Sequence, residues 1–396
     1  MDGDGHAGSV TGFALALFAF FVAMLGTTLP TPLYPLFEER YGFGPLLVTV
    51  IFAIYAFGVI AGLILFGNLS DRIGRKPVLL LGLGLSAASA LLFLFAGSLV
   101  PIYVARIVSG LSAGIFTGTA TAYVIDLAPD GRRRLASFAA VVANLGGLGV
   151  GTLLAGLLAQ WAPHALRLPF AVDLCLVVAA AVGLLLAPET VRRTGAFRLT
   201  LQRLGVPAEV AAVFVRAGLA GFAAFAVSGV FSSVAPEFLS VGLDHHSPAL
   251  AGLLVFVLFL MSVAGQALVL HLRNALAVGC ALLVVGVALL ALSLAVDSLA
   301  ALFASAVVAG LGQGVVVSAG LASIVERTPV ARRGETASSF FVVLYFGLSI
   351  PVIACGVAIH YTSLRTAGIG FCVATGALAL AVLASEERSR RLGVAT

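Results

Sequence analysis

The stretch at residues 67–77, GNLSDRIGRKP, separates two long apolar runs and carries four charged side chains, those of Asp71, Arg72, Arg75 and Lys76. This concentration is unusual here, because only 10% of the 396 residues are charged and 61% are hydrophobic. Soluble domains carry about 25% charged residues, and the mean hydropathy of +1.15 is too high for one. We therefore predict that the stretch is a short polar loop between two membrane spans.

The apolar runs around this loop and along the rest of the chain are long enough to cross a bilayer, which takes about 20 residues per helix. We predict an all-α membrane protein with twelve transmembrane helices. They are expected near residues 12–36, 46–67, 78–97, 100–125, 136–160, 167–187, 212–236, 248–270, 275–296, 299–325, 337–359 and 364–385.

Lysine and arginine are distributed unequally over the connecting segments. With both termini placed in the cytoplasm, the cytoplasmic segments hold seventeen of these residues and the opposite loops hold three, Arg40, Arg167 and Arg365. Such an excess marks the cytoplasmic side of a membrane protein. We expect a multi-pass protein of the bacterial plasma (inner) membrane, and we attribute the net charge of +5 to topology rather than to a nucleic-acid partner.

The two halves of the chain repeat a pattern at an offset of 200 residues. Pro129 corresponds to Pro329, and Gly114 corresponds to Gly314. Two copies of a six-helix unit are the simplest account of this repeat, and paired repeats with a site at their interface are typical of alternating-access transporters. The expected units are an N-terminal bundle over residues 1–190, a cytoplasmic linker over 191–210, and a C-terminal bundle over 211–396 that ends in a short basic tail.

The loop at residues 67–77 resembles the signature G-x-L-a-D-r-x-G-r-k of the major facilitator superfamily. The matching residues are Gly67, Leu69, Asp71, Arg72, Gly74, Arg75 and Lys76. The resemblance implies two pseudo-symmetric six-helix bundles and a cytoplasmic gate between them. In that gate Asp71 would lie at the start of helix 11, near Glu335, where free N–H groups favour an anion. Arg75 would pair with Asp126 at the end of helix 4.

Two charged residues, Arg106 and Asp173, are predicted deep inside helices 4 and 6, where a charge costs roughly 2.5–3.5 kcal/mol and usually has a function. Arg106 opens the pattern R-x-x-x-G-x-x-x-G with Gly110 and Gly114, which resembles a second family motif linked to proton movement or substrate charge. We expect Arg106 and Asp173 at similar depth, serving proton coupling or substrate charge. Purely structural roles for both residues stay open as alternatives.

Helix 5 contains the sequence NLGGLGVGTLLAG, which is similar to an exporter motif of the same family. Gly147, Gly151 and Gly156 match the motif, while Thr152 replaces its proline. Glycines at this spacing allow close packing of helices in lipid. We expect the three glycines to pack against a neighbouring helix.

The candidate substrate cavity contains few polar residues, which predicts a mainly apolar site. Its expected lining residues are Thr28, Thr31, Tyr34, Tyr55, Asn144, Ser232, Ser233, Gln313, Phe341 and Tyr345. Since no phosphate-binding loop or hydrolase motif occurs, we predict that the protein is a transporter and not an enzyme. We also expect it to be a monomer. We expect no metal and no cofactor, a proton gradient as the energy source, and a small-molecule substrate and the lipid bilayer as its partners.

The favoured function is proton-coupled efflux of a small hydrophobic compound or drug, working by alternating access. One alternative is an uptake transporter, either a proton symporter or a facilitator, for a small organic acid or sugar. Arg106 would then bind an anionic group. Another alternative is a membrane receptor or assembly factor that no longer transports.

Overall fold

The computed structural model of the protein describes residues 10–129, 131–191 and 201–391. Within these ranges every regular element is a helix, and twelve helical segments are long and apolar enough to cross a membrane. The predicted all-α fold with twelve spans is confirmed. Residues 192–200 of the predicted linker, and the last residues of the predicted tail, lie outside the described ranges.

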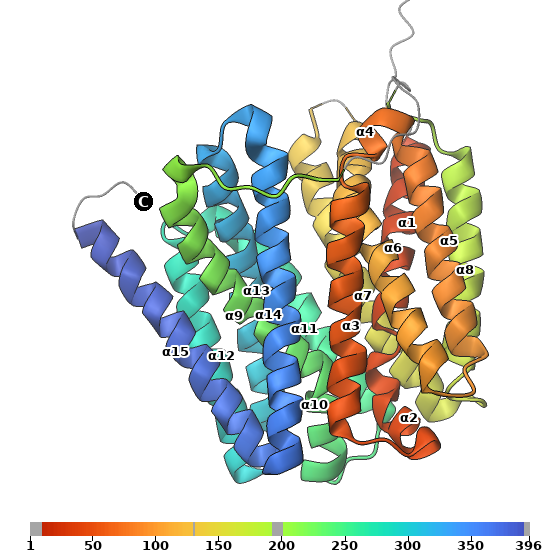
Figure 1. The fold of residues 1–396 in the computed structure, drawn as a ribbon, viewed down its shortest axis with the longest axis vertical. Helices are drawn as coiled ribbons and strands as arrows, with labels where there is room; N and C mark the ends of the chain where they lie inside the picture. Colours follow the sequence, from red (N-terminus) through yellow and green to blue (C-terminus); the bar gives the residue numbers. More distant parts are fainter. Residues whose placement is uncertain (1–9, 130, 192–200, 392–396) are drawn as a thin grey trace, which may run out of the picture.

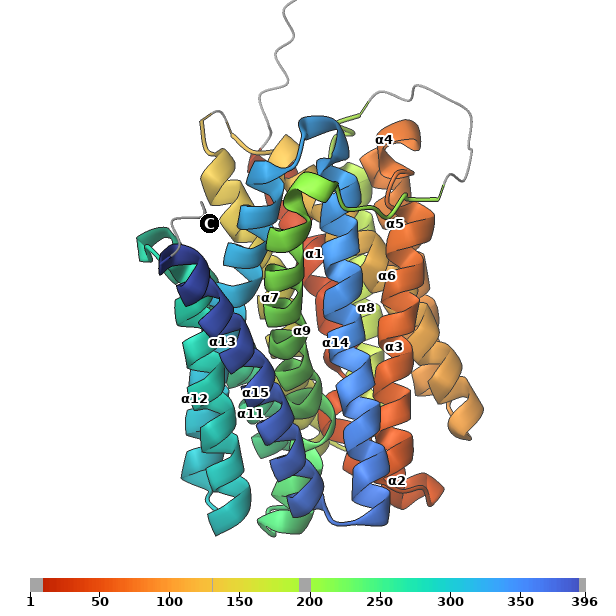
Figure 2. The same cartoon turned by 60° about the vertical axis from the view of Figure 1, so that its left-hand side comes forward.

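The helices form two groups that lie side by side (Figures 1 and 2). We call the end of the molecule that carries α4 the α4 end, and the opposite end the α2 end. The first group comprises α1 (Val10–Thr28), η1 (Thr31–Leu33), α2 (Tyr34–Tyr41), α3 (Pro45–Phe66), α4 (Ser70–Ile73), α5 (Arg75–Leu94), α6 (Leu99–Asp126), α7 (Arg133–Trp161) and α8 (Leu168–Leu186). The second comprises η2 (Ala208–Val210), α9 (Ala211–Ser233), α10 (Ala235–Glu237), η3 (Phe238–Gly242), α11 (Pro248–Leu268), η4 (Val269–His271), α12 (Ala275–Val296), α13 (Leu299–Arg327), η5 (Val330–Arg332), α14 (Arg333–Tyr361) and α15 (Leu364–Arg391).

The first span is not the continuous helix that was predicted over residues 12–36. α1 ends at Thr28, a 3₁₀ turn follows, and α2 begins at Tyr34. The break falls among Pro30, Pro32 and Pro35, which lack the N–H group that a continuous helix requires. The polypeptide therefore bends toward the α2 end, where Thr28 and Thr31 line the central cavity.

Paired glycines bring helices within each half into backbone contact. A Cβ atom built on Gly110 of α6 would lie 2.9 Å from the Cα of Gly58 in α3, and one built on Gly114 would lie 2.9 Å from the Cα of Gly62. Only glycine permits such an approach without displacing the neighbouring backbone. The close contact fixes α6, and with it Arg106, against α3.

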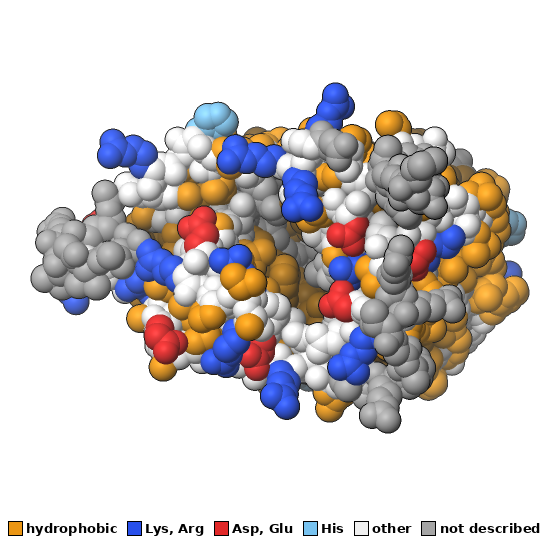
Figure 3. Space-filling view, turned by 90° about the horizontal axis from the view of Figure 1, so that it is seen from above, with side chains coloured by type: hydrophobic (Ala, Val, Ile, Leu, Met, Phe, Trp, Pro, Cys, Tyr) orange, Lys and Arg blue, Asp and Glu red, His pale blue; other side chains and the backbone are white. Residues whose placement is uncertain are grey.

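The two halves contact each other at the α2 end. There the Thr152 hydroxyl of α7 lies 3.1 Å from the Gly252 carbonyl of α11. On the other flank α14 packs against α3, because a Cβ built on Gly356 would lie 2.9 Å from the Cβ of Thr49. Figure 3, which views the α4 end, shows a hollow between the halves with hydrophobic side chains in its depth. The structure is thus closed at the α2 end and open at the α4 end.

The chain that joins the halves is bonded to both of them at the α4 end. The Gln202 N–H donates to the carbonyl of Ile64 in α3 (2.7 Å), and the Gly205 N–H donates to the Ser339 hydroxyl of α14 (2.9 Å). Figures 1 and 2 show this segment crossing from the end of α3 toward α9. We call residues 201–206 the linker strap.

Candidate transport site

A central cavity of about 700 Å³ lies between the halves, lined by α1, α3, α6 and α7 on one side and α9, α11, α13 and α14 on the other. Eight of the predicted cavity residues line it: Thr28, Thr31, Tyr55, Asn144, Ser232, Gln313, Phe341 and Tyr345. The other two do not line it. Tyr34 is 1% exposed and its hydroxyl has no partner, while the Ser233 hydroxyl donates to the Gly229 carbonyl of its own helix (2.7 Å).

Several polar lining residues were not predicted. They are Thr117, Thr121, Ser137, Ser228, Ser262, Gln266 and Ser318. The hydroxyls of Thr117 and Thr121 donate to carbonyls one turn back in α6, at 2.8 and 3.0 Å, so their own bonding is satisfied within the helix. Their spacing along α6, eleven and fifteen residues after Arg106, places all three on one face and could have identified them.

Arg106 is buried, at 2% exposed, and it reaches the cavity. Its Nη1 donates to the Thr27 carbonyl (2.7 Å) and its Nε to the Ile51 carbonyl (3.3 Å). The guanidinium carbon lies 4.5 Å from the ring centroid of Tyr55, a distance at which a cation is attracted to the ring face. Among the described residues no carboxylate forms an ion pair with it, so its charge is available to whatever occupies the cavity.

Asp173 of α8 also lies against α1. It is 2% exposed and does not line the cavity. Its carboxylate faces Gly26, where an added Cβ would lie 2.9 Å from Oδ2, and its Oδ1 has no hydrogen-bond partner. In the described structure the two charges form no ion pair, and they contact α1 at neighbouring positions, Gly26 and Thr27.

The predicted gate loop forms one of its two expected contacts. Arg75 Nε lies 3.3 Å from Asp126 Oδ2. Asp71, however, pairs with Arg75 within the loop at 2.5 Å and is 63% exposed. Among the described residues it forms no ion pair or hydrogen bond with the start of α14, where Glu335 pairs with Arg332. The expected contact is therefore absent from the structure described here, which is open at the α4 end.

The remaining loop residues support the start of α5. Leu69 is buried, and Arg72 is exposed. Gly74 has a φ of +104°, and a Cβ there would lie 3.0 Å from the carboxyl carbon of Glu189. The Glu189 carboxylate accepts the N–H groups of Arg75 (2.9 Å) and Lys76 (3.0 Å).

Glu189 therefore stands at the N-terminus of α5, which no side chain of its own segment caps. Lys76 adds a second connection, because its Nζ donates to the carbonyls of Leu185 and Ala187 at 2.8 Å. Gly67 adjoins the linker strap, since a Cβ there would lie 3.2 Å from Gln202 Oε1. The loop was predicted as a gate, and its role in holding α8 to α5 was not foreseen.

The helix 5 glycines pack on two different helices. Gly147 and Gly151 of α7 face α1, since added Cβ atoms would lie 2.9 Å from the Met24 Cβ and 3.0 Å from the Leu25 carbonyl carbon. Gly156 faces α11, 3.1 Å from the Ala249 Cα by the same measure. The motif thus joins α7 to α1 within one half and to α11 across the interface.

The sequence and fold place the chain among known transporters. A sequence profile of the Major Facilitator Superfamily matches residues 16–350. The chain belongs to the Major Facilitator Superfamily. The family assignment made from the loop at residues 67–77 is confirmed, and this member of the superfamily is a multi-pass membrane transporter.

Curated relatives are similar to parts of this transporter. The class B tetracycline resistance protein of Escherichia coli is 34% identical over 116 residues, 29% of this chain and 28% of the relative. Multidrug resistance protein 2 of Bacillus subtilis is 29% identical over 174 residues, 43% of this chain and 42% of the relative. The arabinose-proton symporter of the same organism is 27% identical over 96 residues, 24% of this chain and 21% of the relative. The alignments thus span well under half of each relative.

Solved structures share the fold over almost the whole chain. A peptide transporter POT mutant in complex with sulfate has a TM-score of 0.77 at 16% identity and covers 99% of this chain and 97% of its own. An inward-facing, unoccupied bacterial homologue of the human lysosomal transporter Spinster has a TM-score of 0.73 at 16% identity, with 98% of both chains covered. At this identity the likeness extends to the fold alone.

Proposed function

We propose that this transporter exports small, largely hydrophobic compounds in exchange for protons. The main support for this proposal is the composition of the central cavity. Its described lining combines phenylalanine, leucine and valine side chains with scattered hydroxyls and a single charged residue, Arg106. A mostly apolar wall with few polar groups suits a drug-sized hydrophobic ligand. The printed names of the relatives, which include tetracycline and multidrug resistance proteins, favour the same function.

The orientation of the open cavity fits export. By the distribution of lysine and arginine, the α4 end is the cytoplasmic end, because its loops carry most of the positive charge. We assign the chain to the bacterial inner membrane with both termini in the cytoplasm. A cavity open at that end can accept a hydrophobic compound from the cytoplasm or from the inner leaflet. Closure of the α4 end and opening of the α2 end would then release it outside.

The charge of the cavity favours neutral or anionic compounds over cations. Arg106 is permanently protonated, and no acidic side chain among the described lining residues balances it. A cationic ligand would be repelled by this charge, because the largely apolar wall of the cavity screens it less than bulk water does. We therefore place weak acids and neutral compounds with acceptor oxygens in the substrate class.

Asp173 is the residue that we propose for proton binding. A buried carboxylate without a partner is costly to keep ionised, and the Oδ1 atom of Asp173 has none in the structure described. Loss of the proton would place a negative charge against Gly26 of α1. Because Arg106 donates to the next residue, Thr27, α1 connects the protonation of Asp173 to the one charged side chain among the described lining residues.

A second candidate function is proton-coupled uptake of a small organic acid or sugar. Arg106 supports it, since a cavity-facing arginine can bind a carboxylate with two parallel hydrogen bonds. The similarity to the arabinose-proton symporter of Bacillus subtilis supports it as well. The two functions differ in the direction of proton flow relative to substrate.

Transport in proteoliposomes under an imposed pH gradient tests the proposal, with tetracycline, benzoate and arabinose as probes chosen after a binding screen on the purified chain. We expect tetracycline or benzoate to move against proton flow. Arg106→Ala should abolish transport, and Asp173→Asn should remove most of its dependence on the gradient, because an amide does not take up and release a proton as a carboxyl group does. Matched controls are Ile107→Ala and Cys175→Ser, exposed neighbours on the same helices.

Arabinose entering together with protons would favour the uptake function instead. Proton dependence that is unchanged in both Arg106→Ala and Asp173→Asn would overturn the coupling assignment. Membership of the transporter family would stand in either case, since it rests on the match over residues 16–350.

A further inference from the structure

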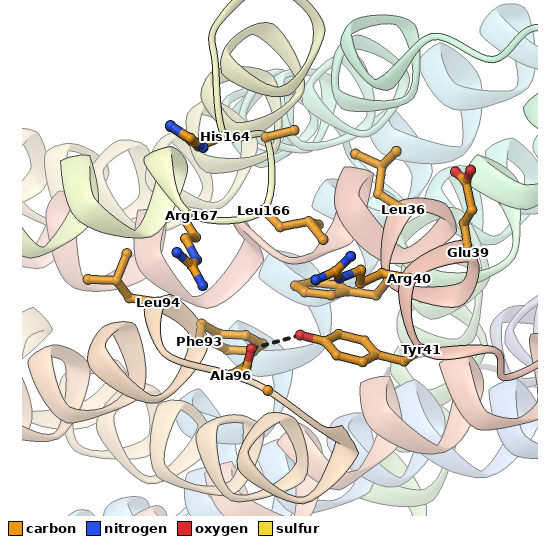
Figure 4. Close-up of a pocket in the computed structure, with 13 residues that line it drawn as sticks. Leu36, Glu39, Arg40, Tyr41, Phe93, Leu94, Ala96, His164, Leu166 and Arg167 are labelled. Atoms are coloured by element: carbon orange, nitrogen blue, oxygen red, sulfur yellow. Dashed lines mark hydrogen bonds between the residues drawn. The ribbon is translucent and has the colours of Figure 1, made fainter.

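A second large pocket, of about 920 Å³, lies at the α2 end and outside the central cavity (Figure 4). Its lining comes from α2, from the end of α5 and the following loop, and from the loop between α7 and α8. All of these belong to the first half, so the pocket is not on the path between the halves. A ligand bound there would not be in transit.

Two arginines on different elements converge on this pocket. Figure 4 shows the guanidinium groups of Arg40, on α2, and Arg167, before α8, both turned into the space that the lining residues enclose. In the described structure neither forms an ion pair with an acid. Glu39 also lines the pocket, but its side chain extends away from that of Arg40 (Figure 4). The pocket thus presents two positive charges that no neighbouring acid neutralises.

The position of Arg167 is not explained by helix stability. It is the residue that precedes the first turn of α8, and no side chain caps that turn. A helix N-terminus carries partial positive charge and disfavours a cation. The third arginine at this end shows the contrast, because Arg365 is paired with Asp297 at 2.5 Å. Arg167 and the N-terminus of α8 both attract an anion that the described chain does not supply.

The backbone around the two arginines is held in place. The Tyr41 hydroxyl donates to the Ala96 carbonyl (2.8 Å), tying the end of α2 to the loop after α5 (Figure 4). His164 has a φ of +59°, and its backbone carbonyl accepts hydrogen bonds from the backbone N–H groups of Arg167 (2.8 Å) and Leu168 (3.0 Å). Beneath them Phe93 stacks on Phe170 with ring centroids 4.6 Å apart. Hydrogen bonds and stacked aromatic rings thus fix the elements that form the pocket.

The surroundings indicate which anion fits. Trp161 ends α7 just before the loop that carries Arg167 and is 73% exposed, and exposed tryptophans mark the depth of lipid headgroups. Leucines line the pocket beside the arginines, at Leu36, Leu94 and Leu166. A soluble phosphate would leave this apolar wall unused, whereas a lipid would place its phosphate on the arginines and the start of its acyl chains on the leucines.

We propose that this pocket binds the phosphate headgroup of an anionic phospholipid in the leaflet at the α2 end, held by Arg40 and Arg167. The site goes beyond the proposed transport function and does not depend on it. Bound lipid would fasten α2 to the α7–α8 loop and so would stabilise the first half of the transporter.

Native mass spectrometry of the full chain in detergent, titrated with phosphatidylglycerol, tests the site. We expect phosphatidylglycerol to bind at least about fivefold more tightly than phosphatidylcholine, and Arg40→Gln and Arg167→Gln each to weaken it about fivefold, the effect of about 1 kcal/mol per arginine near a membrane surface. The variant with both substitutions should bind phosphatidylglycerol about 25-fold more weakly than the unsubstituted chain. Arg40→Lys and Arg167→Lys should retain most of the binding, which would show that the substituted chain still folds.

Arg365→Gln is the matched control, since it removes an arginine at the same end that already has an acid partner. The proposal is overturned if Arg365→Gln weakens binding as much as the other two variants, or if Arg40→Gln and Arg167→Gln leave it unchanged. Equal binding of the two lipids to the unsubstituted chain would also overturn it. So would competition by glycerol 3-phosphate at the concentration of the lipid, because the ligand would then be a soluble phosphate.

Discussion

At the scale of single residues, glycines decide how closely helices approach. Gly110 of α6 lies directly on α3, and a Cβ built there would meet backbone atoms of Gly58 and Val59 at 2.9 Å. A backbone cannot move aside as a flexible side chain can. The same helix contains Gly118, which has open space around the position of a Cβ. The two glycines therefore give opposite expectations for the same substitution.

Gly110→Ala should destabilise the transporter by about 1–3 kcal/mol, the usual cost of overpacking a tight contact. Gly118→Ala should leave stability unchanged or raise it slightly, because alanine favours a helix over glycine by about 1 kcal/mol. Thermal denaturation of both variants in detergent measures the difference. Equal melting temperatures for the two would show that the α3–α6 contact is not as close as described.

The sequence identified some of these residues and not others, for physical reasons. Gly110 and Gly114 were predicted because they follow Arg106 at helical spacing, while their partners Gly58 and Gly62 carry the same four-residue spacing and were overlooked. The orientation of Asp173 could not be predicted. Its helix is apolar on all sides, so no periodicity distinguishes the face toward α1 from the face toward the cavity.

At the scale of elements, the start of α5 depends on a residue more than a hundred positions away. Glu189 follows α8 and accepts the first N–H groups of α5, while Gly74 leaves room for its carboxylate. An acid at a helix N-terminus is stabilised by the free N–H groups and by the helix dipole. The contact therefore fastens two outer helices of the first half to each other.

Glu189→Ala should destabilise the transporter by about 0.5–2 kcal/mol, the range measured for the loss of a helix cap. Glu387→Ala is the control, since Glu387 is exposed and lies in α15 far from the N-terminus of that helix. Thermal denaturation again provides the measurement. A Glu189→Ala variant as stable as Glu387→Ala would mean that α5 does not need this cap.

Helix boundaries were predicted correctly where a polar loop separates two apolar runs, and they were misjudged where prolines interrupt an apolar run. The polar loop at residues 67–77 separates α3 from α5 as expected, with the short α4 between them. The first helix was extended through Pro30, Pro32 and Pro35, although each proline argues against continuation. The cap by Glu189 could not be predicted, because contacts across a sequence separation this large depend on packing that no local pattern encodes.

At the scale of the whole molecule, the structure is closed at the α2 end by contacts between the halves. Thr152 of α7 contributes one of these contacts. Its hydroxyl lies 2.7 Å from the Gly149 carbonyl of its own helix and 3.1 Å from the Gly252 carbonyl of α11, so the two carbonyls share its one hydrogen. In the exporter motif this position holds a proline, so threonine provides a hydroxyl that the motif lacks. If the transporter alternates between two states, the contact with Gly252 exists only in the state closed at the α2 end.

Thr152→Val should shift the population toward the opposite state by about 2-fold. The hydroxyl shares its hydrogen with the Gly149 carbonyl, so the contact with Gly252 contributes about 0.5 kcal/mol, the low end of the range for a hydrogen bond. Spin labels on cysteines at Leu135 and Val330, exposed positions of the two halves at the α4 end, should then report a larger fraction of short distances. Cys175→Ser removes the exposed native thiol.

Thr121→Val is the control, because the Thr121 hydroxyl bonds only within its own helix. It should leave the distance distribution as it is. A distribution that is the same in Thr152→Val and in the unsubstituted chain would contradict the role of this contact in closing the α2 end.

The linker strap is attached to α3 in a way that tolerates changes of sequence during evolution. Its bond to α3 is made by main-chain atoms, the Gln202 N–H and the Ile64 carbonyl, and every amino acid except proline carries that donor. Side-chain drift at these positions would leave the tie intact. The connection of the strap to α3 at the α4 end is thereby buffered against point mutation, and the length of the connecting segment becomes the variable on which selection can act.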